Sequence, residues 1–195
     1  MQQWLHWSEK LRNAVEPYDL NVYVHVGMNS SQEAASLART VAGLASGGVK
    51  GIFSMPPTYF RPNSVDALVD AMAVVAAGAP DLPFWYYHFP AMTDVDLDMF
   101  EFVRRADESG KIPNLMGVKF TNEQIMAFNQ IGNYKSKKYN MLMGRDEILT
   151  SALTTGVADG AVGSTLNFMS FNCPLIDLYA TGNKADKEKA DALQL

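Results

Sequence analysis

Short apolar runs alternate with longer amphipathic segments along this 195-residue chain, and this rhythm most restricts how the chain can fold. Each apolar run has the length of a β-strand. Runs such as Phe84-Trp85-Tyr86 are continuously apolar, which indicates strands covered on both faces. The predicted strands are Val22–Val26, Gly51–Met55, Pro83–His88, Leu115–Phe120, Tyr139–Met143 and Gly160–Gly163.

The segments between these runs have helical patterns. Ser30-Ser31-Gln32-Glu33 has the form of a capping box, and apolar residues follow it at helical spacing until Gly47-Gly48. The predicted helices run from this box to Leu44, from Asn63 or Ser64 to Gly78 and from about Asp96 to Asp107, with further helical patterns at Gln3–Val15 and Lys184–Leu195. Strict alternation of strands and helices predicts a parallel sheet, because parallel neighbours need long crossovers.

Two architectures have this rhythm, an open doubly wound sheet and a closed (β/α)8 barrel. Chemically capable groups follow nearly every predicted strand, and a barrel gathers all strand ends around one mouth. The chain has no glycine-rich dinucleotide or phosphate loop, which a doubly wound sheet often has at its switch point. The barrel is therefore the favoured prediction, on the strand-end groups His25, Tyr87-His88, Lys119, Asp146-Glu147 and Ser164-Thr165.

The predicted barrel is incomplete. A closed barrel of ~250 residues has eight strands, whereas this sequence offers six. We expect residues 1–195 to form one partial (β/α) barrel domain of about six βα units, with the first two strands and the C-terminal helices of a full barrel missing.

Composition excludes several classes of function. A formal net charge of -5 leaves no basic excess for nucleic acid or anionic membranes. No run approaches the ~18 apolar residues of a membrane span, and the start of the chain does not resemble a secretion signal. Cys173 is the one cysteine and the three histidines are scattered, so we expect no disulfide, no metal site and a cytoplasmic protein.

Lys119 is the most informative polar residue because it lies in the apolar run Leu115–Phe120. An unpaired ammonium there would lose hydration at a cost of several kcal/mol, which favours the neutral amine. A neutral amine can attack a ketone and form an iminium that accepts electrons when a neighbouring carbon–carbon bond breaks, without metal or cofactor. The alternative is that Lys119 extends along the strand edge to water.

The other strand-end groups each have a structural and a chemical interpretation. Tyr87 could shuttle a proton at a barrel mouth or simply pack, as we expect of Tyr86. The pairs Asp146-Glu147 and Ser164-Thr165 could cap helices or bind an oxygen-rich ligand. His25 is interpreted as a structural histidine, outside the active site.

Five segments, in this order, resemble the N-acetylneuraminate lyase family: His25-Val26-Gly27, Tyr87-His88-Phe89-Pro90, Gly117-Val118-Lys119, Gly144-Arg145-Asp146-Glu147 and Gly160–Thr165. The resemblance runs from about Leu20 to Phe168. It implies a (β/α)8 barrel, a class I aldolase without cofactor or metal, and assembly as a homotetramer.

The resemblance also implies roles for individual residues. Lys119 matches the Schiff-base lysine and Tyr87 the catalytic tyrosine. The positions matching substrate-binding residues are Thr121, Gly144, Asp146, Glu147, Ser164 and, less closely, Tyr59. Related dihydrodipicolinate synthases usually have an arginine soon after the proline that follows the tyrosine, whereas Ala91-Met92-Thr93 follows Pro90 here.

The function expected from this resemblance is cleavage of N-acetylneuraminate, a sialic acid, to N-acetylmannosamine and pyruvate. Departures from the family keep two alternatives open. The family's Gly-Ser-Thr-Gly-Glu segment would precede Met1, and Leu166 stands where many lyases have tyrosine. The chain could therefore be an inactive fragment or interaction subunit, or an aldolase of the dihydrodipicolinate synthase type acting on another 2-keto acid.

Overall fold

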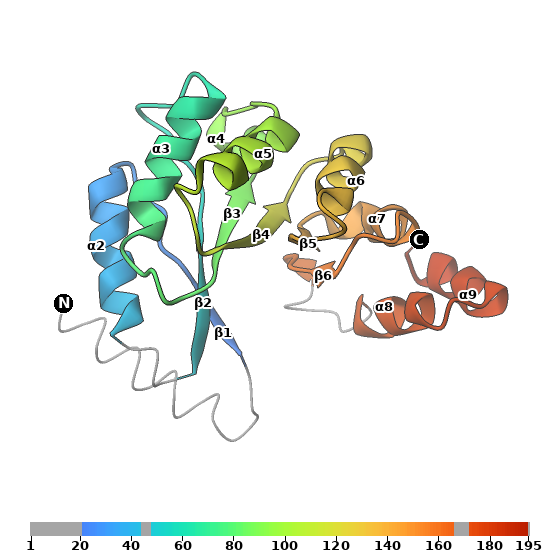
Figure 1. The fold of residues 1–195 in the computed structure, drawn as a ribbon. Coiled ribbons are helices and arrows are strands. Elements are labelled where there is room, and N and C mark those ends of the chain that lie inside the picture. Colours follow the sequence, from blue (N-terminus) through green and yellow to red (C-terminus); the bar gives the residue numbers. More distant parts are fainter. Residues whose placement is uncertain (1–20, 44–47, 166–171, 195) are drawn as a thin grey trace.

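The computed structural model describes residues 21–43, 48–165 and 172–194. Within them, six strands form one parallel sheet whose spatial order, β1-β2-β3-β4-β5-β6, is the order along the chain (Figure 1). The strands are β1 Val22–His25, β2 Val49–Ser54, β3 Phe84–His88, β4 Leu115–Phe120, β5 Asn140–Met143 and β6 Gly160–Ala161. Every predicted strand is confirmed, and β4 has the predicted bounds.

Helices connect and flank the strands as predicted. They are α2 Ser31–Ala42, α3 Val65–Ala76, α4 Pro90–Thr93, α5 Met99–Ser109, α6 Ile125–Asn133, α7 Leu149–Thr154, α8 Asn172–Ala180 and α9 Lys184–Gln194, with a 3-10 turn at Asp146–Ile148. Side-chain caps fix the starts of three of them: Ser30, Ser64 and Asp98 each accept a hydrogen bond from the backbone N–H three residues on. The third helix therefore begins after Asp98 rather than at Asp96.

Helix α2 is shorter than predicted. It ends at Ala42, where the Gly43 N–H bonds to the Arg39 carbonyl oxygen, so the turn comes before the predicted end at Leu44. Gly47, Leu44, the predicted helix at Gln3–Val15 and Leu166 lie outside the described residues.

The strand order decides between the two predicted architectures. In a doubly wound sheet the order reverses at a switch point and helices cover both faces. Here the order never reverses, and right-handed crossovers between successive parallel strands put every connecting helix on the same face. The sheet is therefore part of the wall of a barrel, and one of its faces is free of connecting helices.

The main core lies between the sheet and these helices. Outward-facing strand residues such as Phe84, Val118 and Phe120 are fully buried against helical residues such as Phe102 and Phe128. Tyr86 belongs to this layer, with its ring centroid 4.7 Å from that of Phe102, which confirms the packing role expected for it. Burial also raises the pKa of the Tyr86 hydroxyl.

Alternate strand residues face the other side of the sheet, where they form an aromatic layer. The Phe53 and Trp85 rings stack at 5.3 Å between centroids, and Tyr23 meets Trp85 edge-on at 5.3 Å. Trp85 donates its indole N–H to the Asn140 side-chain oxygen at 2.9 Å, across Gly117. A Cβ on Gly117 would lie 1.9 Å from the Asn140 carbonyl oxygen, so only glycine fits there.

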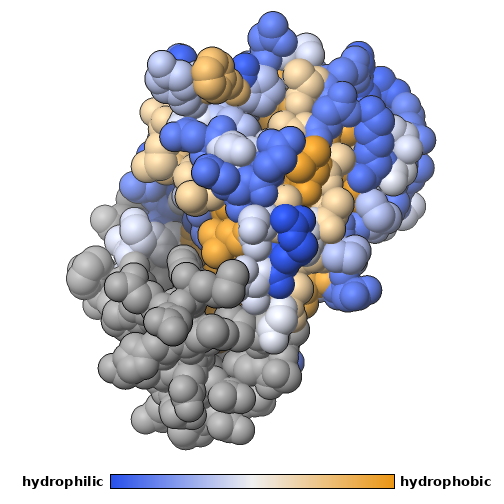
Figure 2. Space-filling view, turned by 90° about the vertical axis from the view of Figure 1, so that its left-hand side faces the viewer, coloured by the Kyte–Doolittle hydropathy of each residue, from blue (hydrophilic) through white to orange (hydrophobic). Residues whose placement is uncertain are grey.

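On the face that contains α2, hydrophilic residues dominate and hydrophobic ones form smaller patches between them (Figure 2). Among the described residues, no helix is long and apolar enough to cross a membrane.

A carboxylate near the end of α5 holds the connection between α6 and β5. Three successive residues of this connection have left-handed backbone, with φ of 44° at Lys135, 58° at Ser136 and 66° at Lys137. Such backbone costs ~1–2 kcal/mol per residue outside glycine. The Asp107 side chain is 6% exposed, and its carboxylate forms ion pairs with the ammonium groups of Lys135 and Lys138.

Two phenols complete the environment of Asp107. Tyr139 donates its hydroxyl to the carboxylate at 2.9 Å and Tyr134 at 3.3 Å. The ammonium groups of Lys135 and Lys138 hold the pKa of Asp107 well below its usual value. Because this folded-state pKa lies below the unfolded-state value, ionised Asp107 stabilises the fold above the usual aspartate pKa of ~4, and the contribution disappears as pH falls further.

We predict that Asp107→Asn lowers the free energy of unfolding by about 1–3 kcal/mol near neutral pH, the range for losing a hydrogen-bonded charge. The difference from the unmodified chain should shrink as pH falls below ~4, because the carboxylate is then protonated in the unfolded chain while it stays ionised in the folded one down to its lower pKa. Urea unfolding at a series of pH values would measure both effects. Asp70→Asn is the control, because Asp70 and its partner Lys111 are exposed and this change should have little effect. Equal effects of both substitutions, or no pH dependence, would contradict the prediction.

Candidate active site

Lys119 and Tyr87 lie side by side because the strand register pairs them. β3 and β4 are parallel, and Tyr87 is the register partner of Lys119. Side chains at paired positions point to the same face of a sheet, here the face free of connecting helices. The Lys119 amine lies 3.8 Å from the centroid of the Tyr87 ring. The sequence predicted both groups at neighbouring strand ends, and the alternative of a Lys119 that extends to bulk water does not describe this geometry.

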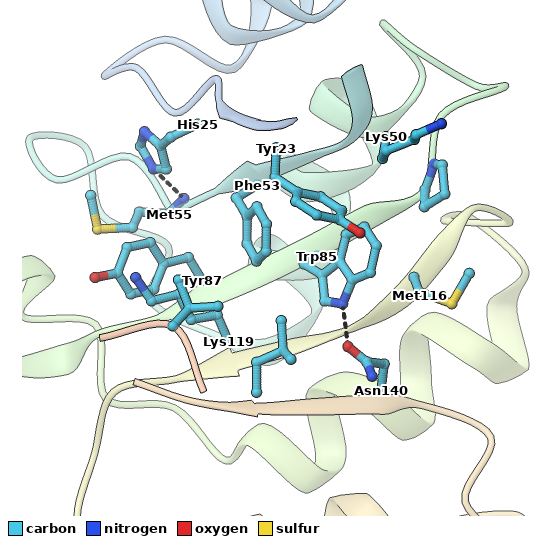
Figure 3. A pocket seen from close by; sticks show the side chains of 13 residues that line it. Tyr23, His25, Lys50, Phe53, Met55, Trp85, Tyr87, Met116, Lys119 and Asn140 are labelled. Carbon is cyan, nitrogen blue, oxygen red and sulfur yellow. Dashed lines mark hydrogen bonds between the residues drawn. The ribbon is translucent and has the colours of Figure 1, made fainter. Parts of the chain in front are cut away.

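The two side chains line a cavity of about 810 Å³ (Figure 3). Figure 3 shows Tyr87, Lys119 and His25 together at one end, where strands β1, β3 and β4 finish. Apolar side chains, including Phe53, Trp85 and Met116, extend the lining toward the other end. Within the described chain no carboxylate lies within ion-pair distance of Lys119, and its amine faces the Tyr87 ring.

His25, which the sequence indicated as a structural histidine outside the active site, lines the same cavity as Lys119 and Tyr87. Its ring lies edge-on to Tyr87 at 6.0 Å between centroids, and its Nε2 accepts a hydrogen bond from the Met55 backbone N–H at 3.3 Å. Burial, followed by the positive charge of Lys119, lowers the pKa of His25. A neutral ring with an acceptor at Nε2 carries its proton on Nδ1. The signal in the sequence was alternation, because His25 shares the inward face with Tyr23.

Thr121 and Gly144 are in contact just beyond β4 and β5. The Thr121 side chain is 5% exposed, and its hydroxyl has no hydrogen-bond partner among the described residues. A Cβ on Gly144 would lie 1.9 Å from this hydroxyl oxygen, so glycine is needed for the close approach. The Gly144 N–H bonds to the Phe120 carbonyl oxygen at 2.8 Å, which fixes the two segments together.

Asp146 joins the segments that follow β5 and β6. Its carboxylate accepts hydrogen bonds from both the backbone N–H and the hydroxyl of Thr165, and it lies against Gly163. The turn at Asp146–Ile148 and helix α7 have no side-chain cap, so this carboxylate does not cap the helix that follows it. Glu147 and Ser164 are exposed. Asp146, Glu147 and Ser164 are not among the described residues that line the cavity with Lys119.

Tyr59 lies in the loop after β2, away from this cavity. Its side chain is 76% exposed and meets the 82% exposed Phe60 edge-on at 4.9 Å. Tyr59 is not one of the described residues that line the cavity with Lys119. In the described ranges, no group of three histidine, cysteine or acidic side chains is arranged to hold a metal ion.

Comparison with known proteins agrees with this geometry. Residues 9–194 match the model of the dihydrodipicolinate synthetase family. The chain is 38% identical over 185 residues to N-acetylneuraminate lyase of Xenopus tropicalis, covering 94% of this chain and 57% of that protein. It is 37% identical over 164 residues to N-acetylneuraminate lyase of Mus musculus, covering 84% of this chain and 48% of that protein.

Solved structures give the same result. N-acetylneuraminate lyase from Aliivibrio salmonicida superposes with a TM-score of 0.78 and 30% identity, over 96% of this chain and 61% of that one. The Proteus mirabilis enzyme of the same name superposes with a TM-score of 0.77 and 29% identity, over 94% and 62%. The chain thus spans about half to three fifths of the length of these relatives. Over nearly its whole length, the chain belongs to the dihydrodipicolinate synthetase family, whose members are Schiff-base class I aldolases.

Proposed function

We propose that this chain is an N-acetylneuraminate lyase in which Lys119 is the Schiff-base residue and Tyr87 the proton-transfer residue. The observation that carries the proposal is the 3.8 Å approach of the Lys119 amine to the Tyr87 ring inside a cavity of about 810 Å³. A cavity of this size is in the usual range for small-molecule sites. The names and identities of the relatives support the choice of sugar-acid substrate.

The chemistry begins with imine formation. The neutral Lys119 amine attacks the keto carbon of the open-chain sugar acid, and loss of water leaves a positively charged iminium. The hydroxyl on the second carbon from the iminium carbon then loses its proton, and the bond between that carbon and the carbon next to the iminium breaks. The bonding electrons move to the iminium nitrogen and give an enamine, while the sugar leaves as an aldehyde. Protonation of the enamine carbon and hydrolysis release pyruvate and restore Lys119.

Tyr87 is the group best situated to move these protons. Its ring faces the Lys119 amine, so its hydroxyl reaches the same part of the cavity as a carbon bonded to that amine. His25 packs edge-on against the Tyr87 ring, and the Met55 backbone N–H holds its Nε2. We assign His25 a supporting role, in which its neutral ring keeps the phenol in place beside the amine.

The remaining family positions form the proposed sugar-binding segment. Thr121 offers a buried hydroxyl, next to Gly144, that has no hydrogen-bond partner in the described part of the chain. Asp146, Glu147 and Ser164 follow β5 and β6 at the same edge of the sheet and supply acceptors and a hydroxyl for a polyol. Tyr59 is assigned to the outer rim because it is exposed. The proposal also includes assembly as a homotetramer, which the family resemblance implies. It treats residues 1–195 as one partial barrel domain.

A non-catalytic role is the second candidate, and one observation favours it. The chain spans 57% of the Xenopus tropicalis relative, and the aromatic face of its sheet is uncovered by helices within the described residues. Tyr23 on that face is 46% exposed and Met116 is 42% exposed. Exposed apolar surface of this kind suits association with another chain, for example an intact family member.

We predict that pyruvate with borohydride leaves a reduced pyruvyl adduct on Lys119. Borohydride reduces the imine to a stable amine, so peptide mass spectrometry would identify the modified residue. Lys119→Arg should abolish the adduct. Lys50→Arg is the matched control, because Lys50 lines the same cavity away from Tyr87 and its loss should leave the adduct unchanged. A folded chain that gains no adduct at Lys119 would favour the non-catalytic alternative.

We further predict that Tyr87→Phe retains the adduct but slows cleavage of N-acetylneuraminate by about 10²–10⁴-fold, the usual contribution of a positioned acid or base. Release of pyruvate, followed with a coupled dehydrogenase, would measure this. Tyr86→Phe is the control, because the Tyr86 hydroxyl is on the opposite face and has no hydrogen-bond partner among the described residues. Equal rates for both variants would remove Tyr87 from the mechanism, and a preference for another 2-keto acid would redefine the substrate.

A further inference from the structure

A buried polar pair lies directly behind Lys119 and Tyr87, on the helix side of the sheet. His88 is the last residue of β3 and is 2% exposed, and Asn122 comes two residues after the end of β4 and is 8% exposed. The Asn122 side-chain nitrogen lies 3.3 Å from Nε2 of His88. Neither residue has a role in the proposed reaction, and buried polar groups that are retained in a core need an explanation.

The hydrogen bonds determine which atom donates. The backbone N–H of Gln124 donates to the Asn122 side-chain oxygen at 3.2 Å, so the Asn122 amide must present its NH2 group to His88. Nε2 of His88 is therefore the acceptor, and the proton of the neutral ring is on Nδ1. Burial lowers the pKa of His88 to about 4, which keeps the ring neutral near pH 7. In a protonated ring, Nε2 would carry a proton and face the Asn122 NH2 group donor to donor, so this hydrogen bond would be lost.

The pair also joins the main chains that carry the site. The Thr121 N–H donates to the His88 carbonyl oxygen at 2.8 Å, which extends the β3–β4 hydrogen bonding past the end of β4. The rings of His88 and Phe120 pack with centroids 4.9 Å apart. Side-chain, main-chain and ring contacts thus converge on the two strand ends, one residue from Tyr87 and one from Lys119.

We propose that His88 and Asn122 are positioning residues that hold the Tyr87 phenol against the Lys119 amine from the opposite face of the sheet. The side chains of Tyr87 and His88 project to opposite faces of one strand, so a shift of the β3 end that follows loss of the His88 bond also moves the phenol. The effect on turnover rests on the proposed function. The effect on the distance between amine and ring does not.

A purely structural pair would behave differently. Its loss would lower stability, because Asn122 would keep a buried donor without a partner, but the approach of Lys119 to Tyr87 would remain. A measurement of that approach separates the two explanations. Variants must also keep the packing around Phe120, so that misfolding does not imitate a positioning effect.

The test uses reductive ¹³C-methylation of lysines and NMR. A dimethylated Lys119 over the face of Tyr87 should give a methyl signal shifted upfield from exposed lysines, assigned by its absence in Lys119→Arg. His88→Phe retains an aromatic ring but removes the acceptor, and we expect the Lys119 signal to move toward the position of exposed lysines. His88→Gln, which offers an acceptor oxygen at similar reach, should restore the upfield shift.

Asn122→Ser gives a second and milder test. Serine can still accept the Gln124 N–H but cannot reach His88, so the Lys119 signal should move toward that of exposed lysines here too. This variant decides the question if His88→Phe fails to fold. The double variant should be no worse than either single one, because both remove the same bond. An unchanged Lys119 signal in folded His88→Phe or Asn122→Ser would overturn the proposal.

Kinetics then connect the pair to turnover. His88→Phe should lower kcat about 10–100-fold with little change in KM, since a displacement near 1 Å can cost 10²-fold. His88→Gln should recover most of the loss. If the unmodified chain forms no pyruvate adduct, the proposed function fails while the NMR result still decides the positioning role. If the adduct forms and His88→Phe retains full kcat, the positioning role fails alone.

Discussion

The register between β3 and β4 is the constraint on which the candidate site depends. Tyr87 meets Lys119 only because the two strands pair at these residues, and a slip by one residue would send one of the side chains to the helix side. Backbone hydrogen bonds at both ends of the strands fix the pairing. The Phe84 N–H donates to the Asn114 carbonyl oxygen at 2.9 Å, and the Thr121 N–H donates to the His88 carbonyl oxygen at 2.8 Å. Between them, the Trp85 indole crosses Gly117 to Asn140, which a side chain at that glycine would prevent.

Much of this arrangement could be predicted from the sequence, because strand periodicity and parallel connections are local properties. The six strands and the proximity of Lys119 to Tyr87 followed from the apolar runs and their polar ends. Contacts between distant segments could not be predicted. Nothing near Asp146 in the chain indicates that its carboxylate binds the backbone of Thr165 instead of capping its own helix. The place of His25 in the cavity lining was not predicted, because alternation puts it on the inward face but its contact with Met55 depends on the register with β2.

The two faces of the sheet have different physical roles. On the helix side, large side chains such as Phe84 and Phe120 are completely buried, and this core supplies most of the burial in the described chain. On the other face, the aromatic layer of Phe53 and Trp85 lines a cavity that continues up to Lys119. Among the described residues the Lys119 amine has no carboxylate partner, and it lies beside neutral His25 in a mainly apolar lining. This environment suits a nucleophile better than a structural ion pair.

In our proposal, strand residues carry out the imine chemistry and loop residues bind the substrate tail, which has a consequence for substrate choice. Lys119 and Tyr87 are strand residues whose spacing is set by main-chain register and, in our proposal, by His88 and Asn122 behind them. Asp146 and Ser164 instead follow β5 and β6, and the link from Asp146 to Thr165 holds their segments to each other rather than to the amine. Changes in these segments can therefore alter which sugar tail is accepted without disturbing imine formation. A fold of this kind keeps its chemistry while its loops change specificity, because the two sets of residues are fixed by separate interactions.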